Sequence, residues 1–205
     1  NGWSVFSRKG FLAEWRKGRQ VASIDLRSMS GLPGEHNHQN ACCAYAVCRS
    51  IGLAPKLIEE KLNSYVGLTH RCQTVGTFNG VTYVNDSKAT NVDAAKKALL
   101  AFKSILWIVG GESKEGGVLP LKPYFNRIKK AYLIGTDVSD LIKDLSSIDF
   151  VIAGSISEAV RLASLDAEKN DVVLLAPACA SFDQYENFEK RGDDFINNVM
   201  LVNRD

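Results

Sequence analysis

The chain has 205 residues, of which 45% are hydrophobic and 23% charged, and its formal net charge is +2. This length allows one good core or one and a half domains. The nearly balanced charge argues against a polyanion-binding surface, so no nucleic-acid partner is expected. No run approaches the roughly 20 apolar residues of a membrane-spanning helix.

The first third of the chain predicts a small antiparallel meander followed by two helices. Short apolar runs alternate with Gly and basic residues through residue 33, which is typical of short strands and tight turns. Residues 40–48 are rich in Ala and Cys, and residues 55–62 supply a second helical stretch. Because Asn1 stands almost directly before a strand-like run, we expect the chain to be an internal part of a longer protein.

A regular alternation of strands and helices follows a predicted boundary near Gly67 and Leu68. Continuous apolar runs such as residues 105–109 and 172–176 indicate strands buried on both faces, and therefore a parallel sheet. We predict a Rossmann-like, doubly wound α/β domain with a mostly parallel sheet. The strands are expected at residues 81–84, 105–109, 131–134, 150–153 and 172–176, and the helices at 92–102, 121–127, 137–145, 156–167 and 184–202.

Polar loops follow three of these strands, at residues 85–91, 110–114 and 177–183. Loops at the carboxyl ends of parallel strands can share one crevice, which is where open α/β sheets bind ligands. Lys88 and Lys114 would place two positive charges there, near helix N-termini that favour carboxylates or phosphates. The loops therefore suit a nucleotide or an anionic substrate.

Each of these residues also has a purely structural interpretation. Asn91 could simply cap its helix, and Ser181 or Asp183 could cap the last one. Gly110 and Gly111 could serve only to turn the chain. On residue chemistry alone, an anion site and an ordinary set of capped connections stay equally open.

The cysteines and histidines favour neither a disulfide framework nor a metal site. The five cysteines are odd in number and lack C-x-x-C spacing, which fits the reduced thiols of a cytoplasmic protein. His36 and His38 have no cysteine partners at zinc spacing, so we expect no metal site. Cys179 has no histidine in its domain except His70, and an inert, packed thiol is favoured over a nucleophile.

Two further clusters suit a nucleotide. Arg71 can bond a phosphate with both arms of its guanidinium fork, and Asn37 and Asn40 could present amides to a base edge. The chain has no G-x-x-x-x-G-K-[ST] loop and no G-x-G-x-x-G motif. A triphosphate cradle would have to come from elsewhere, and we expect the chain alone to hydrolyse no ATP.

Taken in order, these motifs resemble those of the Mur ligases. They are G-x-H-N-x-x-N (residues 34–40), L-x-H-R (68–71), N-D-S-K-A-T-N (85–91), G-G-x-x-K (110–114) and P-A-C-A-S-x-D-Q-x-x-N-F-x-x-R-G (177–192). Within the family, N-D-S-K-A-T-N most resembles the members that add D-glutamate. Sibling ligases and folylpolyglutamate synthase typically carry other residues at this position.

The resemblance implies an ATP-dependent ligase of peptidoglycan synthesis. In that family ATP phosphorylates the carboxylate of UDP-N-acetylmuramoyl-L-alanine, and the amine of D-glutamate attacks the acyl phosphate. Residues 1–67 would be the C-terminal part of the central ATP-binding domain, and 68–205 the C-terminal, Rossmann-like amino-acid-binding domain. The phosphate loop and Mg²⁺ ligands would belong to the missing upstream part of a monomeric, cytoplasmic enzyme.

The resemblance also implies roles for individual residues. One departure from the family pattern is Cys72, where a larger residue is expected, and this difference should affect packing only. Asn37 and Asn40 would face the adenine. His70, Arg71 and Asp86 would face the ribose and phosphates. Lys88, together with Asp86 and His70, would lie at the reacting centre. Thr90 and Lys114 would hold one D-glutamate carboxylate, and Ser181 with the backbone around Phe182 and Phe188 the other.

Two alternatives stay open at this point. The chain could belong to a Mur-type ligase that adds a different amino acid. It could also be a non-catalytic module that binds a nucleotide or an amino acid, in which case residues 69–205 should bind their ligand tightly without any upstream domain.

Overall fold

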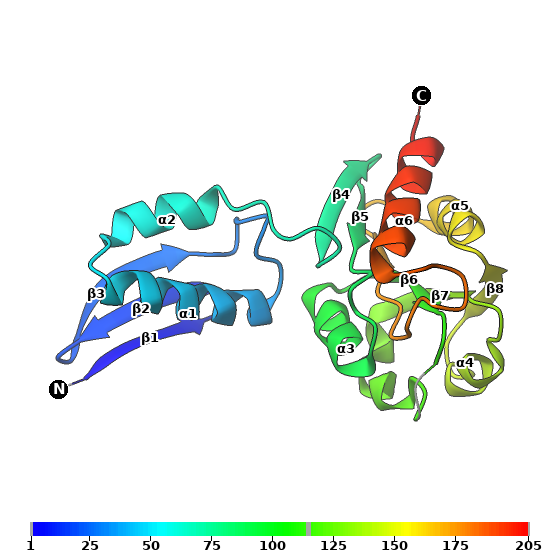
Figure 1. Cartoon of the computed structure of the whole chain (residues 1–205), viewed down its shortest axis with the longest axis horizontal. Coiled ribbons are helices and arrows are strands. Elements are labelled where there is room, and N and C mark those ends of the chain that lie inside the picture. The colour runs from blue at the N-terminus through cyan, green and yellow to red at the C-terminus, as the bar shows by residue number, and fades with distance from the viewer. Residues whose placement is uncertain (1, 114–115, 205) are drawn as a thin grey trace. The chain divides into compact units, whose positions relative to one another are not determined.

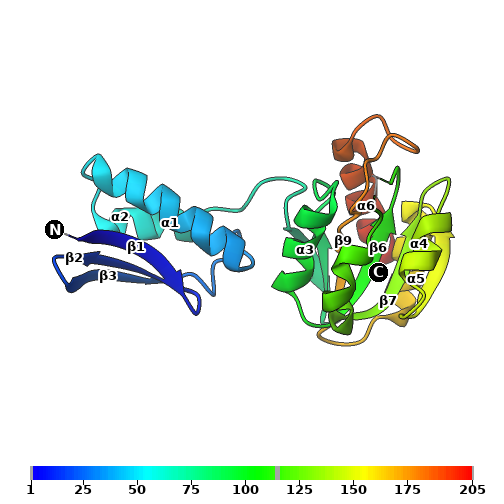
Figure 2. The ribbon, with the colours of Figure 1, turned by 90° about the horizontal axis from the view of Figure 1, so that it is seen from below.

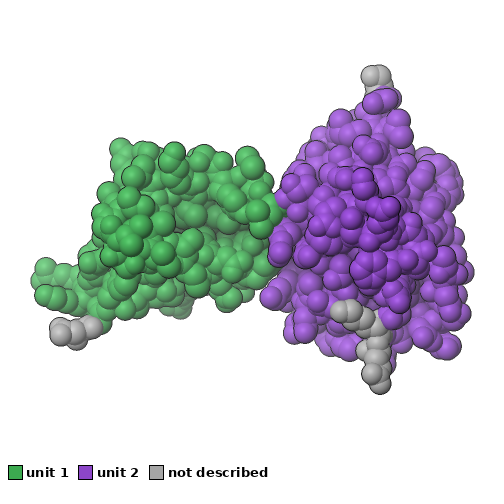
Figure 3. Space-filling model, viewed as in Figure 1, with its two compact units in different colours: residues 1–68 green, residues 69–205 purple. Residues whose placement is uncertain are grey.

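Two units make up the computed structural model, Asn1–Leu68 and Thr69–Asp205, coloured separately in Figure 3. The structure describes residues 2–113 and 116–204 of the chain.

Unit 1 is a three-stranded antiparallel sheet with two helices on one face (Figure 2). The predicted meander is confirmed, because each strand pairs with the next through a tight turn. A small core between sheet and helices contains Leu12, Ile24 and Tyr45, while Phe6 and Phe11 stay exposed on the other face. The elements are β1 (Trp3–Arg8), β2 (Phe11–Arg16), β3 (Arg19–Asp25), α1 (Glu35–Ser50) and α2 (Pro55–Asn63).

A buried carboxylate ties the sheet of unit 1 to α1. Glu14 on β2 is fully buried, and it accepts hydrogen bonds from Tyr45 Oη at 2.7 Å and Arg49 Nε at 2.9 Å. Two further donors come from the sheet itself, Arg16 Nε at 2.7 Å and Trp3 Nε1 at 3.0 Å. Burial by itself would raise the pKa of Glu14, yet these four donors lower it to about 2.

Unit 2 alternates strands and helices along the chain and contains a six-stranded sheet in the order β4-β5-β9-β6-β7-β8. Only the β4–β5 pair is antiparallel, so the prediction of a mostly parallel α/β sheet is confirmed. The strands are β4 (Gln73–Phe78), β5 (Val81–Asn85), β6 (Ile105–Gly110), β7 (Ile128–Ile134), β8 (Phe150–Gly154) and β9 (Val172–Leu175). The helices are α3 (Val92–Ala101), a 3₁₀ helix (Leu119–Arg127), α4 (Ser139–Asp144), α5 (Ile156–Asp166) and α6 (Phe188–Val202).

Helices cover both faces of this sheet, which explains why its central strands are apolar throughout. Every residue of β6 is buried, with Trp107 and Val109 in one core cluster and Leu106 and Ile108 in the other. The first cluster includes residues of α3 and α4, and the second residues of α5 and α6. Figure 1 shows these two pairs of helices on opposite sides of the strands.

Three local features differ from the sequence predictions. The strand β4 was not predicted, because it is short, only partly buried, and contains Gly76 beside an irregularity in its pairing with β5. The segment from Leu119 to Arg127 is a 3₁₀ helix rather than an α-helix, and it contains Pro123, which cannot donate an α-helical hydrogen bond. The last helix begins at Phe188, four residues later than residue 184.

All five cysteines are free thiols. Within the described part of the chain, none of the helices is long and apolar enough to cross a membrane.

The Glu14 network yields a prediction for unit 1. Replacing Glu14 by Gln should lower the free energy of unfolding by on the order of 3 kcal/mol at pH 7, because the donors around it lose their charged acceptor. Because the pKa of Glu14 is about 2 in the folded state, against a usual value of 4.5, the loss should be full above pH 4.5. It should shrink as the pH falls toward 2.

Urea denaturation of wild type and Glu14→Gln across this pH range measures the difference. Glu59→Gln, at an exposed position of α2, is the matched control and should change the free energy of unfolding little. A Glu14→Gln protein as stable as wild type at pH 7 would contradict the network's role.

Candidate functional site

The three polar loops predicted from the sequence converge at one edge of the unit 2 sheet. They follow β5, β6 and β9, which are neighbours in the order β5-β9-β6 with parallel directions. Backbone hydrogen bonds join the loops directly, from Ala178 N to Ala89 O at 2.9 Å and from Gly110 N to Pro177 O at 3.0 Å. A further pair of backbone bonds links Glu112 and Ala180. The predicted convergence is therefore confirmed.

The capping predictions have a mixed outcome. Asn91 caps α3, since its Oδ1 accepts a hydrogen bond from Ala94 N at 2.9 Å. The alternative that Ser181 or Asp183 caps the last helix is wrong, because Asn187 caps α6 through a bond from Lys190 N. Ser181 instead turns the chain, and its carbonyl accepts from Tyr185 N at 2.8 Å.

Gly110 and Gly111 do more than turn the chain. Both have positive φ angles, 132° and 123°, which residues other than glycine rarely adopt. A Cβ at Gly110 would collide with the carbonyl of Ile134, and one at Gly111 with the carbonyl of Ala180. These glycines let the loop after β6 lie directly against its neighbours.

Asp86 is a buried carboxylate with few partners. It is 8% exposed, and its Oδ1 accepts a hydrogen bond from Cys72 N at 3.1 Å. Burial raises the pKa of Asp86 to about 6, although the Cys72 backbone and thiol and the nearby charge of Arg71 act to lower it. A carboxylate perturbed in this way at the carboxyl edge of a parallel sheet is a candidate functional group.

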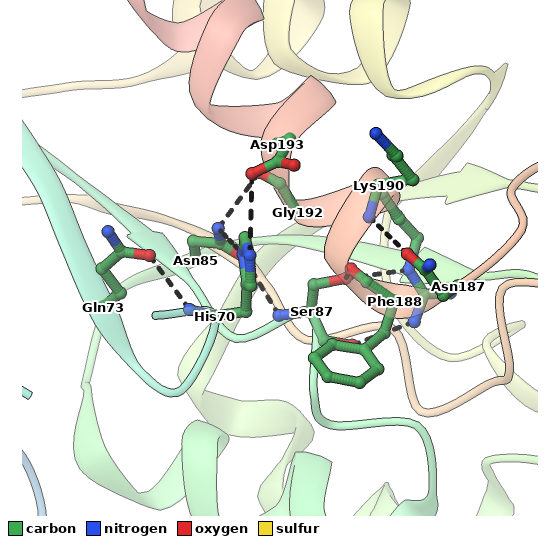
Figure 4. A network of polar contacts seen from close by, with 10 residues as sticks. His70, Gln73, Asn85, Ser87, Asn187, Phe188, Lys190, Gly192 and Asp193 are labelled. Atoms are coloured by element: carbon green, nitrogen blue, oxygen red, sulfur yellow. Dashed lines mark hydrogen bonds and ion pairs between the residues drawn. The ribbon is translucent and has the colours of Figure 1, made fainter. Parts of the chain in front are cut away.

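His70 faces the protein interior (Figure 4). Its Nδ1 lies 3.0 Å from Asn85 Nδ2, which also donates to Gly192 O at 3.1 Å. Because the amide nitrogen can only donate, Nδ1 accepts, and the ring proton lies on Nε2, 3.6 Å from the Asp193 carboxylate. A Cβ at Gly192 would collide with this ring, so the glycine allows His70 to pack against α6.

Three residues of this region have a strained backbone conformation. His70, Cys72 and Ala178 have φ of 61°, 44° and 59°, in the left-handed region that residues with a Cβ rarely occupy. Such strain persists only where surrounding contacts hold it, and it clusters at functional sites. Arg71 lies between two strained residues and is exposed.

The remaining predicted residues border the same edge. Lys88 Nζ lies 3.8 Å from the centre of the Phe188 ring, and Lys88 N donates to His70 O. Thr90 is half-buried, Ser181 is buried, and Phe182 is 69% exposed. Lys114 lies outside the described residues.

A hollow of about 190 Å³ opens between the loops that follow β6, β7 and β9. Its lining includes the carboxylates of Glu112, Asp137, Asp140 and Asp183. These carboxylates favour cations, so an anionic ligand at this edge would need cations and amides that lie outside the lining of the hollow. No group of three or more His, Cys, Asp and Glu is placed to hold a metal ion within residues 2–113 and 116–204.

Asn37 and Asn40 belong to unit 1, where both lie in the first turns of α1. Asn37 Nδ2 donates to Pro33 O at 2.8 Å and Asn40 Nδ2 lies 3.4 Å from Asn37 Oδ1. His38, in the same helix, is buried, and burial lowers its pKa.

Two buried residues at this edge, Asn85 and Arg191, stand in the motifs named above but had no predicted role. Asn85 ends β5 and orients both His70 and the Ser87 backbone. Arg191 is a charged residue on the apolar face that α6 presents with Phe195 and Val199, at helical spacing. Besides its place in the motif of residues 177–192, this charge on an apolar helix face was the signal that could have pointed to a role.

The comparisons with known proteins point to one family. Residues 70–179 match the family model described as Mur ligase, glutamate ligase domain. The chain is 61% identical over 201 residues to the UDP-N-acetylmuramoylalanine--D-glutamate ligase of Cereibacter sphaeroides, covering 98% of this chain and 43% of that protein. The protein of the same name from Roseobacter denitrificans is 59% identical over 198 residues, covering 97% and 42%. The chain thus spans less than half the length of these curated relatives.

Solved structures share the fold at low sequence identity. The UDP-N-acetylmuramate-alanine ligase of Thermotoga maritima has a TM-score of 0.67 at 14% identity, over 97% of this chain and 45% of that one. A bifunctional folylpolyglutamate synthase/dihydrofolate synthase from Yersinia pestis, complexed with AMPPNP and Mn ion, has a TM-score of 0.61 at 18% identity, over 98% and 45%.

The burial of Asp86 predicts an unusual dependence of stability on pH. A carboxyl whose pKa rises from 3.8 to about 6 on folding stabilises the fold only while it is protonated, so its contribution falls as the pH rises from 4 to 6. Asp86→Asn, which keeps an acceptor for Cys72 N, should therefore be more stable than wild type at pH 7.5, by on the order of 2 kcal/mol.

Thermal denaturation of both proteins between pH 4 and pH 8 tests this. The difference should vanish near pH 4, and Asp93→Asn, at an exposed position in the first turn of α3, should show no such trend. A pH-independent difference would mean that burial does not perturb Asp86.

Proposed function

The chain belongs to the Mur ligase family, and we propose that it forms part of an ATP-dependent ligase that adds D-glutamate to UDP-N-acetylmuramoyl-L-alanine in peptidoglycan synthesis. The observation that carries the proposal is its 61% identity to a ligase named for this reaction. The convergence of residues 85–91 and 177–183 at one sheet edge supplies a place for it.

In this proposal Thr90 and Lys114 bind one carboxylate of D-glutamate. Ser181 and the backbone at Phe182 and Phe188 bind the other. The chemistry fits, because hydroxyls, an ammonium and backbone N–H groups are the donors that a dianionic amino acid needs. Holding the amine in place beside its target supplies much of the rate enhancement in such a step.

Lys88 is proposed to act at the reacting carboxyl group. Its ammonium would offset the negative charge that develops on the carboxyl oxygens as the amine attacks. In the structure this ammonium rests on the Phe188 ring, which holds it at the carboxyl edge of the sheet.

Bound ATP would supply the phosphoryl group that activates the acceptor carboxylate. We propose that Arg71 and Asp86 contact the ribose and phosphates, and that Asn37 and Asn40 contact the adenine. The exposure of Arg71 and the raised pKa of Asp86 suit groups that meet a ligand. His70 is also proposed to act near the phosphates and at the reacting centre. Because protein groups face both of its ring nitrogens, an indirect role is favoured for it.

The domain roles are part of the same proposal. Residues 1–67 would complete a central ATP-binding domain whose other residues bind Mg²⁺, and residues 68–205 would form the amino-acid-binding domain. We place the enzyme in the cytoplasm, in keeping with its free cysteines. There it would serve cell-wall synthesis, and so cell shape and division.

A chimeric ligase tests the proposal. This chain would replace the 201-residue segment that it matches in the Cereibacter sphaeroides relative, with the parental enzyme as positive control. Phosphate release should require both UDP-N-acetylmuramoyl-L-alanine and D-glutamate. Thr90→Ala in the chimera should raise the KM for D-glutamate at least about tenfold, the loss expected for one hydrogen bond to a charged group, with the KM for ATP unchanged.

The matched control is Thr77→Ala, an exposed threonine of the edge strand β4, which should leave both KM values unchanged. Equal turnover with L-lysine or diaminopimelate would contradict the assignment of D-glutamate. A folded chimera without activity would contradict the ligase proposal itself.

A further inference from the structure

Arg191 is an almost completely buried cation on α6. The residue is 1% exposed, and no carboxylate in the described part of the chain forms a salt bridge with it. Desolvation lowers its pKa to about 10, so the guanidinium stays charged at neutral pH. A buried charge of this kind requires a compensating set of polar partners.

The partners are oxygen atoms of the three loops. Arg191 donates from Nε to Ser87 Oγ at 3.1 Å and from Nη2 to Ser87 O at 3.0 Å. It reaches the third loop through Cys179 O at 3.2 Å and Ala180 O at 3.1 Å. Its last contact, with Gly110 O, is longer at 3.5 Å. A guanidinium has five N–H donors, and all five are used.

We propose that Arg191 is a positioning residue that aligns the three loops for the amino-acid substrate, an inference that rests on the ligase function proposed above. Its contacts fall on residues next to those assigned to the ligand. Ser87 precedes Lys88, and Ala180 precedes Ser181.

Peptide geometry explains how a contact with one residue orients the next. In a planar trans peptide, the C=O of one residue and the N–H of the following residue point in opposite directions. By holding the Ala180 and Gly110 carbonyls, Arg191 fixes the Ser181 and Gly111 N–H groups to point away from itself. The same bond at Ser87 fixes the peptide that leads into Lys88.

Lysine cannot replace this arrangement. An ammonium has three donors around one point, whereas the guanidinium spreads five donors over a plane. Arg191→Lys keeps the charge and the stem but leaves some of the carbonyls without a donor. The three loops should then lose their common alignment although the sheet beneath them remains.

Hydrogen–deuterium exchange on the chain itself is the first test, and it does not depend on activity. In Arg191→Lys, amides of residues 85–91, 110–113 and 177–183 should exchange at least about tenfold faster, as loss of one to two charge-assisted bonds predicts, while those of β6 and β7 stay protected. The control is Arg127→Lys, because Arg127 also donates to a backbone carbonyl, Phe102 O at 2.7 Å, at the opposite edge of the sheet. Unchanged exchange in the three loops, or equal acceleration throughout unit 2, would overturn the proposal.

The second test uses the chimeric ligase. Arg191→Lys should raise the KM for D-glutamate at least about tenfold with little change in the KM for ATP, whereas Arg127→Lys should change neither. Arg191→Ala should regain activity on addition of millimolar guanidinium, which can enter the vacated space. Equal loss toward both substrates, without rescue, would mean that Arg191 only supports the fold. An inactive chimera with the wild-type sequence would count against the ligase function, while the exchange experiment would still decide the role of Arg191.

Discussion

A guanidinium buried inside a protein must have every N–H group bonded, and in unit 2 this requirement determines how the carboxyl edge of the sheet is built. Arg191 draws its acceptors from the loops after β5, β6 and β9, which lie as much as 104 residues away in sequence. The loops can deliver those oxygens only if three parallel strands are neighbours and α6 crosses their ends. The order of the strands, the position of α6 and the conformation of the three loops are therefore all needed to bond the Arg191 guanidinium. The neighbouring Gly192 adds a further requirement, since only a glycine leaves room for His70.

The parts of this fold that the sequence predicts are those with a local cause. The apolar runs of β6 and β9 fix a parallel sheet because two layers of helices must cover them, and Asn91 marks the start of α3 through its cap. The strand β4 is different. It owes its existence to pairing with β5 at the edge of the sheet, and its own residues give only a weak strand pattern. The 3₁₀ helix likewise occupies the position of a predicted α-helix, but its hydrogen-bonding pattern is that of a 3₁₀ helix.

The candidate site divides in the same way. Its three loops follow from the rule that ligands bind at the carboxyl ends of parallel strands, which needs only the strand positions. The inward orientation of His70 and the five contacts of Arg191 do not follow, because they depend on residues about a hundred positions apart. A charge at position 191, on the same helix face as Phe195 and Val199, does show that buried polar partners are needed. It does not show which residues those partners are. Sequence patterns thus locate the edge, and packing decides which side chains face the ligand.

Two buried carboxylates, Glu14 and Asp86, show why burial alone does not identify a functional group. Glu14 has four donors, and its pKa falls to about 2, so its charge is satisfied within unit 1 and nothing further is needed. Asp86 is buried with its backbone bond from Cys72, and its pKa rises to about 6, so its charge destabilises the fold at neutral pH. A protein that keeps such a group gains nothing in stability from it. The direction of the shift therefore distinguishes a carboxylate that supports the fold from one that does not, and it supports the ligand contact proposed for Asp86.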